Sequence, residues 1–192
     1  MSLYDEISNL ISLKTEGDYW DFKIKWHENM AELLHDIICM ANNLVNKDAY
    51  LIIGVSDSKH PGGVQIKGVP KDNRKSQQNL IDFLKSIKFA GGIRPTVYVQ
   101  TETFGEAVID VIVIKNSNHT PFFLAEPYSY GGKCVQSGHI YTRIGDTNTP
   151  IKNVADIDKI EYLWRKRFGI DLNVNDKLLL LLDSPDDWVG DF

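Results

Sequence analysis

Three carboxylates, those of Glu16, Asp21 and Asp57, have the residue type and the placement to hold a metal ion together. Asp21 lies in a predicted strand, Glu16 precedes that strand, and Asp57 follows the end of a second one. If the two strands are neighbours, the acids converge at one edge of a sheet, where ligands gather at strand ends. Clustered carboxylates repel one another unless a cation neutralises them, and their hard oxygens suit Mg²⁺ or Mn²⁺. Such an ion activates water and stabilises phosphate cleavage.

Basic side chains accompany these acids. In the stretch TEGDYWDFKIKW (15–26), strand alternation places Lys23 and Lys25 on the face that carries Asp21, and the alternate positions are apolar. We therefore expect the outer face of this strand to offer phosphate contacts beside the metal ion.

Three basic residues outside this strand are further candidates for nucleic-acid contacts. Arg143 follows a predicted strand and precedes a glycine turn, and Arg94 follows two glycines that would let a nucleic-acid backbone approach. Lys133 lies in the loop YSYGGKC (128–134), whose aromatic rings offer stacking surfaces beside a cation.

Each of these assignments has a structural alternative. Glu16 and Asp57 stand in turn-forming sequences, and the face with Asp21 could be an ordinary solvated surface with cross-strand ion pairs. A surface salt bridge would account for Arg143, and a helix C-cap before a strand would account for Arg94. The segment around Lys133 could be a plain hairpin loop. Spacing alone does not make a metal site.

The elements that must position these residues indicate an α/β (α+β) fold, with a mixed, mostly antiparallel sheet flanked by helices. The unbroken apolar run AYLIIGV (49–55) is typical of a strand that is covered on both faces. Apolar periodicity predicts helices at 2–13, 29–45, 76–89 and 154–168, and strands at 19–26, 49–55, 64–69, 96–104, 107–115, 121–125 and 139–145.

Composition narrows the class of protein. The net charge of −5 arises in residues 171–192, where six aspartates face one lysine, so the preceding part is neutral and a local basic face is allowed. We assign residues 1–170 to one domain and 171–192 to an acidic segment that starts a further domain.

The sequence also indicates the location of the protein and excludes two classes of site. Two cysteines without CxxC spacing indicate a reducing, cytoplasmic location. No apolar run is long enough to span a membrane. No GxxxxGK[ST] motif is present, so ATP binding through a P-loop is not expected.

Four motifs, in this order along the chain, resemble the Schlafen AlbA-type domain family. They are Glu16 followed by Asp21-Phe22-Lys23, then Ala41-Asn42 at a helix end, Gly54-Val55-Ser56-Asp57, and Tyr141, Arg143 and Gly145 in YTRIG. The resemblance covers about residues 10–168 and implies one lobe of a Schlafen-core-like fold. It agrees with the fold class that the element pattern indicates.

The resemblance also implies an activity. In Schlafen-type ribonucleases, the two acids of the opening motif and the acid of Gly-Val-x-Asp form a metal-dependent site that cleaves structured RNA such as transfer RNA. These roles fall on Glu16, Asp21 and Asp57, although the family commonly has Glu where this chain has Asp21. Animal Schlafens join two lobes, so a single lobe would form a comparable groove as a homodimer. Other members are described as DNA-binding or regulatory, and the fold alone does not settle the activity.

Our leading hypothesis is therefore a nucleic-acid-binding module with Mg²⁺- or Mn²⁺-dependent endoribonuclease activity. Glu16, Asp21 and Asp57 would hold the metal, and Lys23, Lys25, Arg94, Lys133 and Arg143 would contact the nucleic acid. The first rival is a non-catalytic DNA-binding or transcription-regulatory domain in which the same acids are structural. The second is an interaction domain whose effector lies beyond residue 192.

Overall fold

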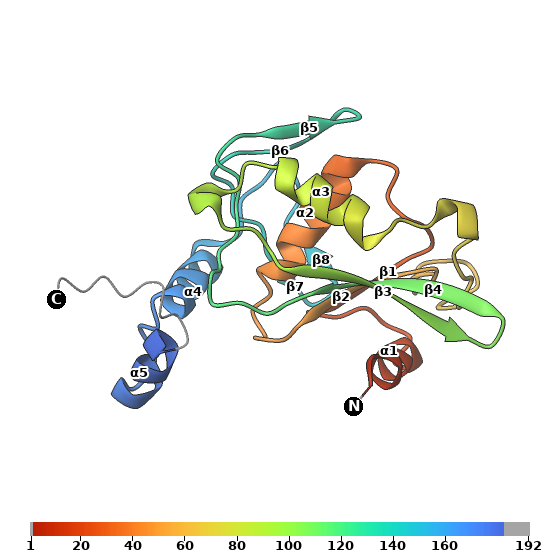
Figure 1. The fold of residues 1–192 in the computed structure, drawn as a ribbon, viewed down its shortest axis with the longest axis horizontal. Helices are drawn as coiled ribbons and strands as arrows, with labels where there is room; N and C mark the ends of the chain where they lie inside the picture. Colours follow the sequence, from red (N-terminus) through yellow and green to blue (C-terminus); the bar gives the residue numbers. More distant parts are fainter. Residues whose placement is uncertain (1, 183–192) are drawn as a thin grey trace.

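The computed structural model describes residues 2–182, whose main feature is a four-stranded sheet with helices on both faces (Figure 1). In chain order its elements are α1 (Leu3–Ser12), β1 (Trp20–Lys23), α2 (Met30–Ala41), β2 (Ala49–Ile53), α3 (Gln77–Ser86), β3 (Val97–Phe104), β4 (Ala107–Ile114), β5 (Tyr128–Tyr130), β6 (Lys133–Val135), β7 (Arg143–Ile144), β8 (Thr147–Asn148), α4 (Ile157–Arg167) and α5 (Val174–Leu182). Short 3₁₀ turns lie at Lys71–Asn73 and Ala90–Gly92.

The sheet has the strand order β1-β2-β4-β3. β1 and β2 run parallel and are connected through α2, so they form a β-α-β crossover, whereas β4 pairs antiparallel with both β2 and β3. The predicted α/β (α+β) class, with a mixed, mostly antiparallel sheet flanked by helices, is therefore confirmed. The crossover therefore places β1, which carries Asp21, next to β2, which precedes Asp57.

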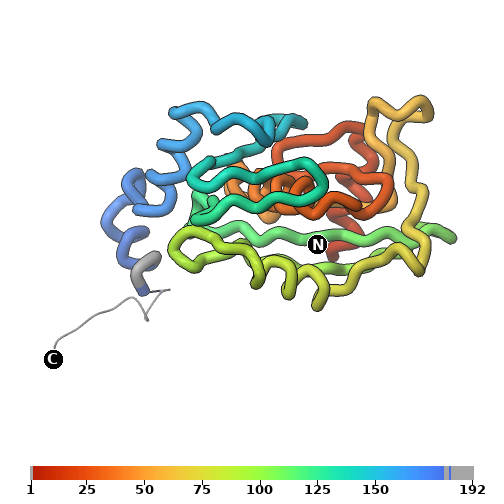
Figure 2. The backbone as a smooth tube through the Cα atoms, turned by 90° about the horizontal axis from the view of Figure 1, so that it is seen from above, coloured from red at the N-terminus to blue at the C-terminus, as the bar shows by residue number. Residues whose placement is uncertain are grey.

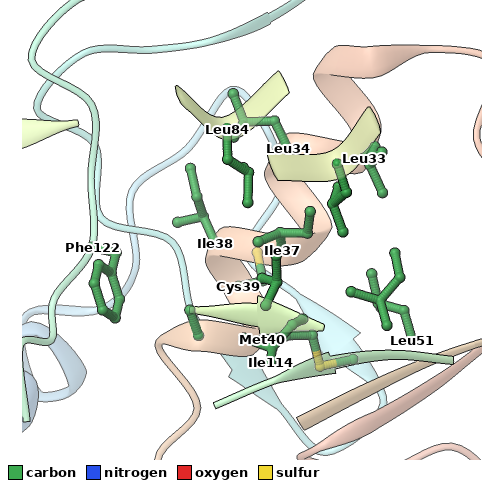
Figure 3. Packing of buried hydrophobic residues seen from close by; sticks show 14 of the residues in the cluster. Leu33, Leu34, Ile37, Ile38, Cys39, Met40, Leu51, Leu84, Ile114 and Phe122 are labelled. Atoms are coloured by element: carbon green, nitrogen blue, oxygen red, sulfur yellow. The ribbon is translucent and has the colours of Figure 1, made fainter. Parts of the chain in front are cut away.

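The larger core lies between α2 and one face of the sheet. Asn29 caps α2 by accepting hydrogen bonds from the N–H groups of Ala31 (2.9 Å) and Glu32 (3.2 Å). The helix that follows is apolar almost all round, because the sheet covers one side of it and α3 and the β5–β6 hairpin cover others (Figures 1 and 2). Figure 3 shows this packing, with side chains of α2 meeting Leu51 and Ile114 of the sheet and Leu84 of α3.

The opposite face of the sheet is covered by α1. Ser2 and Asp5 form a capping box that starts this helix, and its buried residues are Ile7, Leu10 and Ile11. They pack against side chains of β1, β2 and β4 that include Phe22 and Ile52. β2 is thus buried on both faces, as its unbroken apolar sequence predicts.

Several predicted strands are shorter than expected or absent. β1 ends at Lys23, and residues 24–26 leave the sheet. The segments 64–69 and 121–125 form only isolated bridges. The first passes over Gly54 at the end of β2, and the second makes a few backbone hydrogen bonds to residues 88–90 and to Gly138. Of the segment 139–145, only Arg143–Ile144 is a strand.

One buried amide explains how the irregular segments are held. The Asn42 side chain, fully buried at the end of α2, donates to the carbonyl oxygens of Phe122 (2.8 Å) and Tyr141 (2.9 Å). Its own oxygen accepts from the N–H of Phe122 at 2.7 Å. One side chain therefore makes three hydrogen bonds to the backbone of these segments, which do not form the regular strand pairing that the sequence pattern predicts.

The C-terminal part of the described chain consists of α4 and α5. Within residues 2–182, no helix combines the length and the apolar character that crossing a bilayer requires. The division into residues 1–170 and 171–192 stays a prediction, and residues 183–192 of the acidic segment lie outside the described residues.

Candidate functional site

The candidate site lies along β1, which is an edge strand. Two side chains bond to backbone groups at its open side and just before it. The Glu16 carboxylate accepts the N–H of Phe22 at 2.9 Å, and Arg143 donates to the carbonyl oxygens of Gly17 (2.7 Å) and Trp20 (3.3 Å). Because an unpaired strand edge would otherwise be exposed, Glu16 and Arg143 have a structural role that the local sequence does not show.

Asp21 is buried and held between two cations. Its side chain is 5% exposed, with Oδ1 3.2 Å from Arg143 Nη2 and Oδ2 2.6 Å from Lys23 Nζ. The short contact to Lys23 is an ion pair, and no other donor within the described chain reaches Oδ2. The expectation that Asp21 stands on a solvated outer face is therefore wrong. The side of β1 that carries it is covered by α2 and by the β7–β8 hairpin.

A fourth carboxylate, that of Asp36 on α2, extends this charge network. Lys23 Nζ lies 3.2 Å from Asp36 Oδ2, which also contacts His27 Nε2 at 2.8 Å. Asn148 donates to Asp36 Oδ1 and accepts from Arg143, both at 2.9 Å. Burial alone would raise the pKa of Asp36, but hydrogen bonds from His27 and His35 and the charge of Lys23 bring it well below its usual value.

Lys23 is thus shared between two carboxylates. Burial lowers its pKa, but the neighbouring Asp36 and Asp21 charges outweigh burial and raise the pKa above the ordinary lysine value. Lys23 therefore carries its positive charge at neutral pH.

Asp57 reaches the same region from the end of β2. Its Oδ1 accepts the N–H groups of Lys59 (3.0 Å) and His60 (2.8 Å), so it forms the turn that the alternative interpretation predicts. The turn starts where Gly54 adopts φ +102° and its N–H donates to the Lys23 carbonyl oxygen at 2.7 Å. This contact joins the end of β2 to the end of β1.

One open cavity of about 440 Å³ collects these side chains. Glu16, Asp21 and Asp57 all line it, as the neighbouring strands predict. The remaining walls are formed by Phe22, Lys23, Ile24, Lys25, Lys59, Arg143, Asp146 and Asn148. Four acidic and four basic side chains are therefore present, and the buried acids are the ones that Lys23 and Arg143 compensate.

The fit of this cavity to a metal ion depends on Lys23. Carboxylate oxygens are suitable ligands for a hard divalent cation, but the buried Asp21 Oδ2 already has the Lys23 ammonium at 2.6 Å. The positions do not fit as they stand, since no three His, Cys, Asp or Glu side chains among residues 2–182 are placed to hold a metal ion jointly. The metal assignment of Glu16, Asp21 and Asp57 stays a prediction.

Glu16 has the altered titration that a shared acidic site produces. Burial and, next, the charge of Asp21 raise the pKa of Glu16 to about 7. The Phe22 N–H and Arg143 oppose this shift but do not cancel it. Close to neutral pH, Glu16 therefore exchanges a proton.

The predicted nucleic-acid contacts differ in where they lie. Lys25 is 70% exposed at the cavity and pairs with Glu28. Lys133, on the β5–β6 hairpin rather than in a flexible loop, lies 3.5 Å from Glu32 and lines a second cavity that includes Lys23.

Arg94 and Arg143 depart from the expected arrangement. Arg94 is exposed before β3 and does not line the cavity. The Arg143 side chain is only 2% exposed, and its three nitrogens are bonded inside the protein, so its predicted position at the surface is wrong. Arg143 instead connects Gly17, Asp21 and Asn148 inside the protein.

A family model for the Schlafen AlbA_2 domain matches residues 16–152, most of the chain. The chain belongs to the Schlafen AlbA_2 family. The match begins at Glu16, ends just beyond β8, and leaves out α1, α4 and α5. Every residue that lines the cavity therefore lies within the Schlafen AlbA_2 region.

Solved structures offer two further comparisons with this Schlafen AlbA_2 chain. One is the N-terminal domain of a RecG-related protein, named as an ATP-dependent DNA helicase, from Nitrosomonas europaea, with 18% identity and a TM-score of 0.45 over 82% of this chain and 96% of that one. The other is the DIP2311 protein from Corynebacterium diphtheriae, with 15% identity and a TM-score of 0.47 over 77% of this chain and 26% of that one. No curated protein matches the chain.

Several residues of the Schlafen AlbA_2 site escape sequence reasoning. Asp36, His27 and Asn148 complete the network around Lys23, and Lys59 joins the cavity beside Asp57. Asp36 is the one with a detectable signal, because an acid in the apolar helix pattern of 29–45 requires a buried cation.

Proposed function

We propose that this chain is a nucleic-acid-binding module whose phosphate-binding surface is the cavity beside β1. Membership of the Schlafen AlbA_2 family supports a nucleic-acid-binding domain. The observation that carries the proposal is that the negative charge of Asp21, at the buried end of the cavity, is neutralised within the protein. Asp21 faces Lys23 and Arg143, so its negative charge is compensated before a polyanion approaches.

The rim of the cavity then supplies the attraction for phosphate. Lys25 and Lys59 are exposed there, and the pair between Lys25 and Glu28 is an exposed one that holds the lysine weakly. Phosphate contacts of this kind release counterions, so binding should weaken as salt is raised.

The test is fluorescence anisotropy with labelled RNA and DNA duplexes at several salt concentrations. Replacing Lys25 and Lys59 by alanine should weaken binding and lower the salt slope by about 0.7–0.9 for each phosphate contact removed. Lys85→Ala is the matched control, because Lys85 is an exposed lysine on α3 that does not line the cavity. Equal losses of affinity in Lys25→Ala, Lys59→Ala and Lys85→Ala would contradict the proposal.

Metal-dependent cleavage of structured RNA is the second candidate function. The observation that favours it is that Glu16, Asp21 and Asp57 line one cavity, the positions on which the resemblance places an endoribonuclease site. Mg²⁺ or Mn²⁺ would neutralise the carboxylates and supply an activated water. The rival remains a DNA-binding or regulatory domain without cleavage.

Asp57→Asn tests this candidate with little structural change, because an asparagine oxygen can still accept the two turn N–H groups. Labelled transfer RNA and DNA duplexes are incubated with Mn²⁺ or with a chelator. Metal-dependent cutting of RNA that is lost in Asp57→Asn supports the endoribonuclease. Salt-sensitive binding without cutting supports the regulatory rival.

A homodimer is the assembly that we propose for this single lobe. The resemblance to a family with two-lobed members supports it, and a second copy would extend the groove. Light scattering across a range of protein concentrations measures the assembly directly, and a constant monomer mass would exclude the dimer.

A further inference from the structure

Lys23 stands where two carboxylates and two cavities meet. Its Nζ is 2.6 Å from Asp21 Oδ2 and 3.2 Å from Asp36 Oδ2. Lys23 lines the cavity of about 440 Å³ that contains Asp21 and also a neighbouring cavity of about 390 Å³ that contains Asp36. One ammonium group therefore has a carboxylate partner on each side.

The partner on the first side depends on Lys23 for one of its oxygens. Asp21 Oδ2 is buried, belongs to a side chain that is 5% exposed, and has no donor other than Lys23 within the described residues. A buried carboxylate oxygen needs a positive charge close by, and the Lys23 ammonium supplies it at 2.6 Å. A divalent cation would supply the same compensating positive charge.

The partner on the second side is already well held. Asp36 Oδ2 contacts His27 Nε2 at 2.8 Å, and Asp36 Oδ1 accepts from Asn148 at 2.9 Å. Lys23 can leave Asp21 and keep a carboxylate partner, because Asp36 is fixed in place by these neighbours. The 30% exposed side chain of Lys23 leaves room for this movement.

We propose that Lys23 is a resident cation that closes the Asp21 carboxylate to divalent metal ions, and that moving its ammonium away from Asp21, with Asp36 as a remaining partner, opens the carboxylate. The inference deepens the proposed nucleic-acid site and rests on it. It accounts for three acids that line one cavity and yet are not placed to hold a metal jointly.

A coupling between ligands follows from this arrangement. Phosphate near the rim competes with Asp21 for the Lys23 ammonium, so the Asp21 carboxylate is then compensated by Arg143 alone. Nucleic acid should therefore increase the affinity for divalent cations, and by linkage divalent cations should increase the affinity for nucleic acid equally.

The first measurement is a Mn²⁺ titration of the full chain by electron paramagnetic resonance, without nucleic acid. Lys23→Met should bind Mn²⁺ about tenfold or more tightly than the unmodified protein, because it removes the competing charge from Asp21. Lys25→Met is the matched control. It makes the same change of charge in the same cavity but does not touch Asp21, so it should alter Mn²⁺ affinity far less.

The second measurement uses Asp36→Asn, which removes the alternative partner of Lys23. This variant should bind Mn²⁺ more weakly than the unmodified protein and should lose the gain in affinity that an oligonucleotide produces. Thermal melting shows which variants fold, and Lys23→Gln replaces Lys23→Met if the latter does not.

Equal Mn²⁺ affinities in the Lys23 variants and the unmodified protein would overturn the inference, and so would equal gains in Lys23→Met and Lys25→Met. The comparison without nucleic acid is independent of the proposed function, since a protein that failed to bind RNA or DNA would still report the competition between Lys23 and Mn²⁺.

Discussion

Arg143 shows how one buried side chain can connect distant parts of the site. It reaches Gly17 and Trp20 through their carbonyl oxygens, Asp21 through a charge pair, and Asn148 through a hydrogen bond. Removing the guanidinium would take a hydrogen bond from each of the three polar groups and one of the two cationic partners from Asp21. Arginine suits this position because its planar group offers several donors in fixed directions.

Arg143→Met should lower the free energy of unfolding by about 3–5 kcal/mol, because it leaves Asp21 as a buried charge with Lys23 alone. Urea denaturation followed by circular dichroism measures this loss. The exposed Arg94 supplies the control, and Arg94→Met should change stability by less than about 0.5 kcal/mol. Similar losses in both variants would refute the structural role of Arg143.

Glu16 makes stability depend on pH. Its pKa is raised to about 7 in the folded chain from an ordinary value of 4.5, so the folded state binds the proton more tightly than the unfolded state. Stability from this group is therefore greatest below pH 4.5 and is lost as the pH rises toward 7. Glu16→Gln keeps an acceptor for the Phe22 N–H and removes the charge. It should melt at a higher temperature than the unmodified protein at pH 8, with a difference that shrinks at pH 5.

At the scale of elements, the joint between β1 and β2 depends on Gly54. Its φ of +102° is one that other residues rarely adopt, and an added Cβ would lie 3.0 Å from the backbone carbon of Gly68. The crossing segment 66–69 needs this close approach, since Lys67 and Gly68 donate to the Gly54 carbonyl oxygen. The same joint places Asp57 beside β1.

Gly54→Ala should therefore cost about 3 kcal/mol of stability, from backbone strain and from the contact with Gly68. Gly63 lies in the same loop with φ +64° and open space around it, so Gly63→Ala isolates the cost of the backbone conformation, about 1 kcal/mol. Denaturant titrations of both variants give the difference. If Gly54→Ala were as stable as Gly63→Ala, the close approach of Gly68 to Gly54 would make no contribution to the free energy of unfolding.

Sequence periodicity predicts most of the elements, because each one obeys a local rule. The β3–β4 hairpin, the doubly covered β2 and the helix that follows Asn29 all depend on neighbours within a few residues. The alternation in β1 also places Asp21 and Lys23 on one side correctly. It could not reveal that this side is buried, because the covering residues Arg143 and Asn148 come from more than a hundred positions further along the chain. The pairing of Lys23 with Asp36 was hidden for a related reason, since it joins a strand to a helix that separate patterns describe.

For the molecule as a whole, charge is distributed unevenly along the chain. The net charge is −5, and residues 171–192 hold six aspartates against one lysine. The negative field of this acidic segment repels a nucleic acid that approaches the phosphate-binding surface. At 0.1 M salt, this field is screened beyond about 10 Å.

Replacing Asp183, Asp186, Asp187 and Asp191 together by asparagine should therefore strengthen binding to RNA or DNA at low salt. The gain should fade above about 0.5 M salt, where the field of the segment is screened. Anisotropy titrations at two salt concentrations measure it. A gain that persists at high salt would indicate direct contact instead of a long-range field.

The hydrogen bond between Arg143 and Trp20 spans 123 positions of sequence, and this separation has a consequence for synthesis. A nascent chain leaves the ribosome with β1, α2 and β2 long before Arg143 emerges, so the helical packing can form while the outer edge of β1 is still bare. Translation that stops between these points would release a polypeptide with an uncapped strand edge, the kind of surface on which other chains assemble. We therefore expect synthesis of the last third of the domain to protect the first third from aggregation.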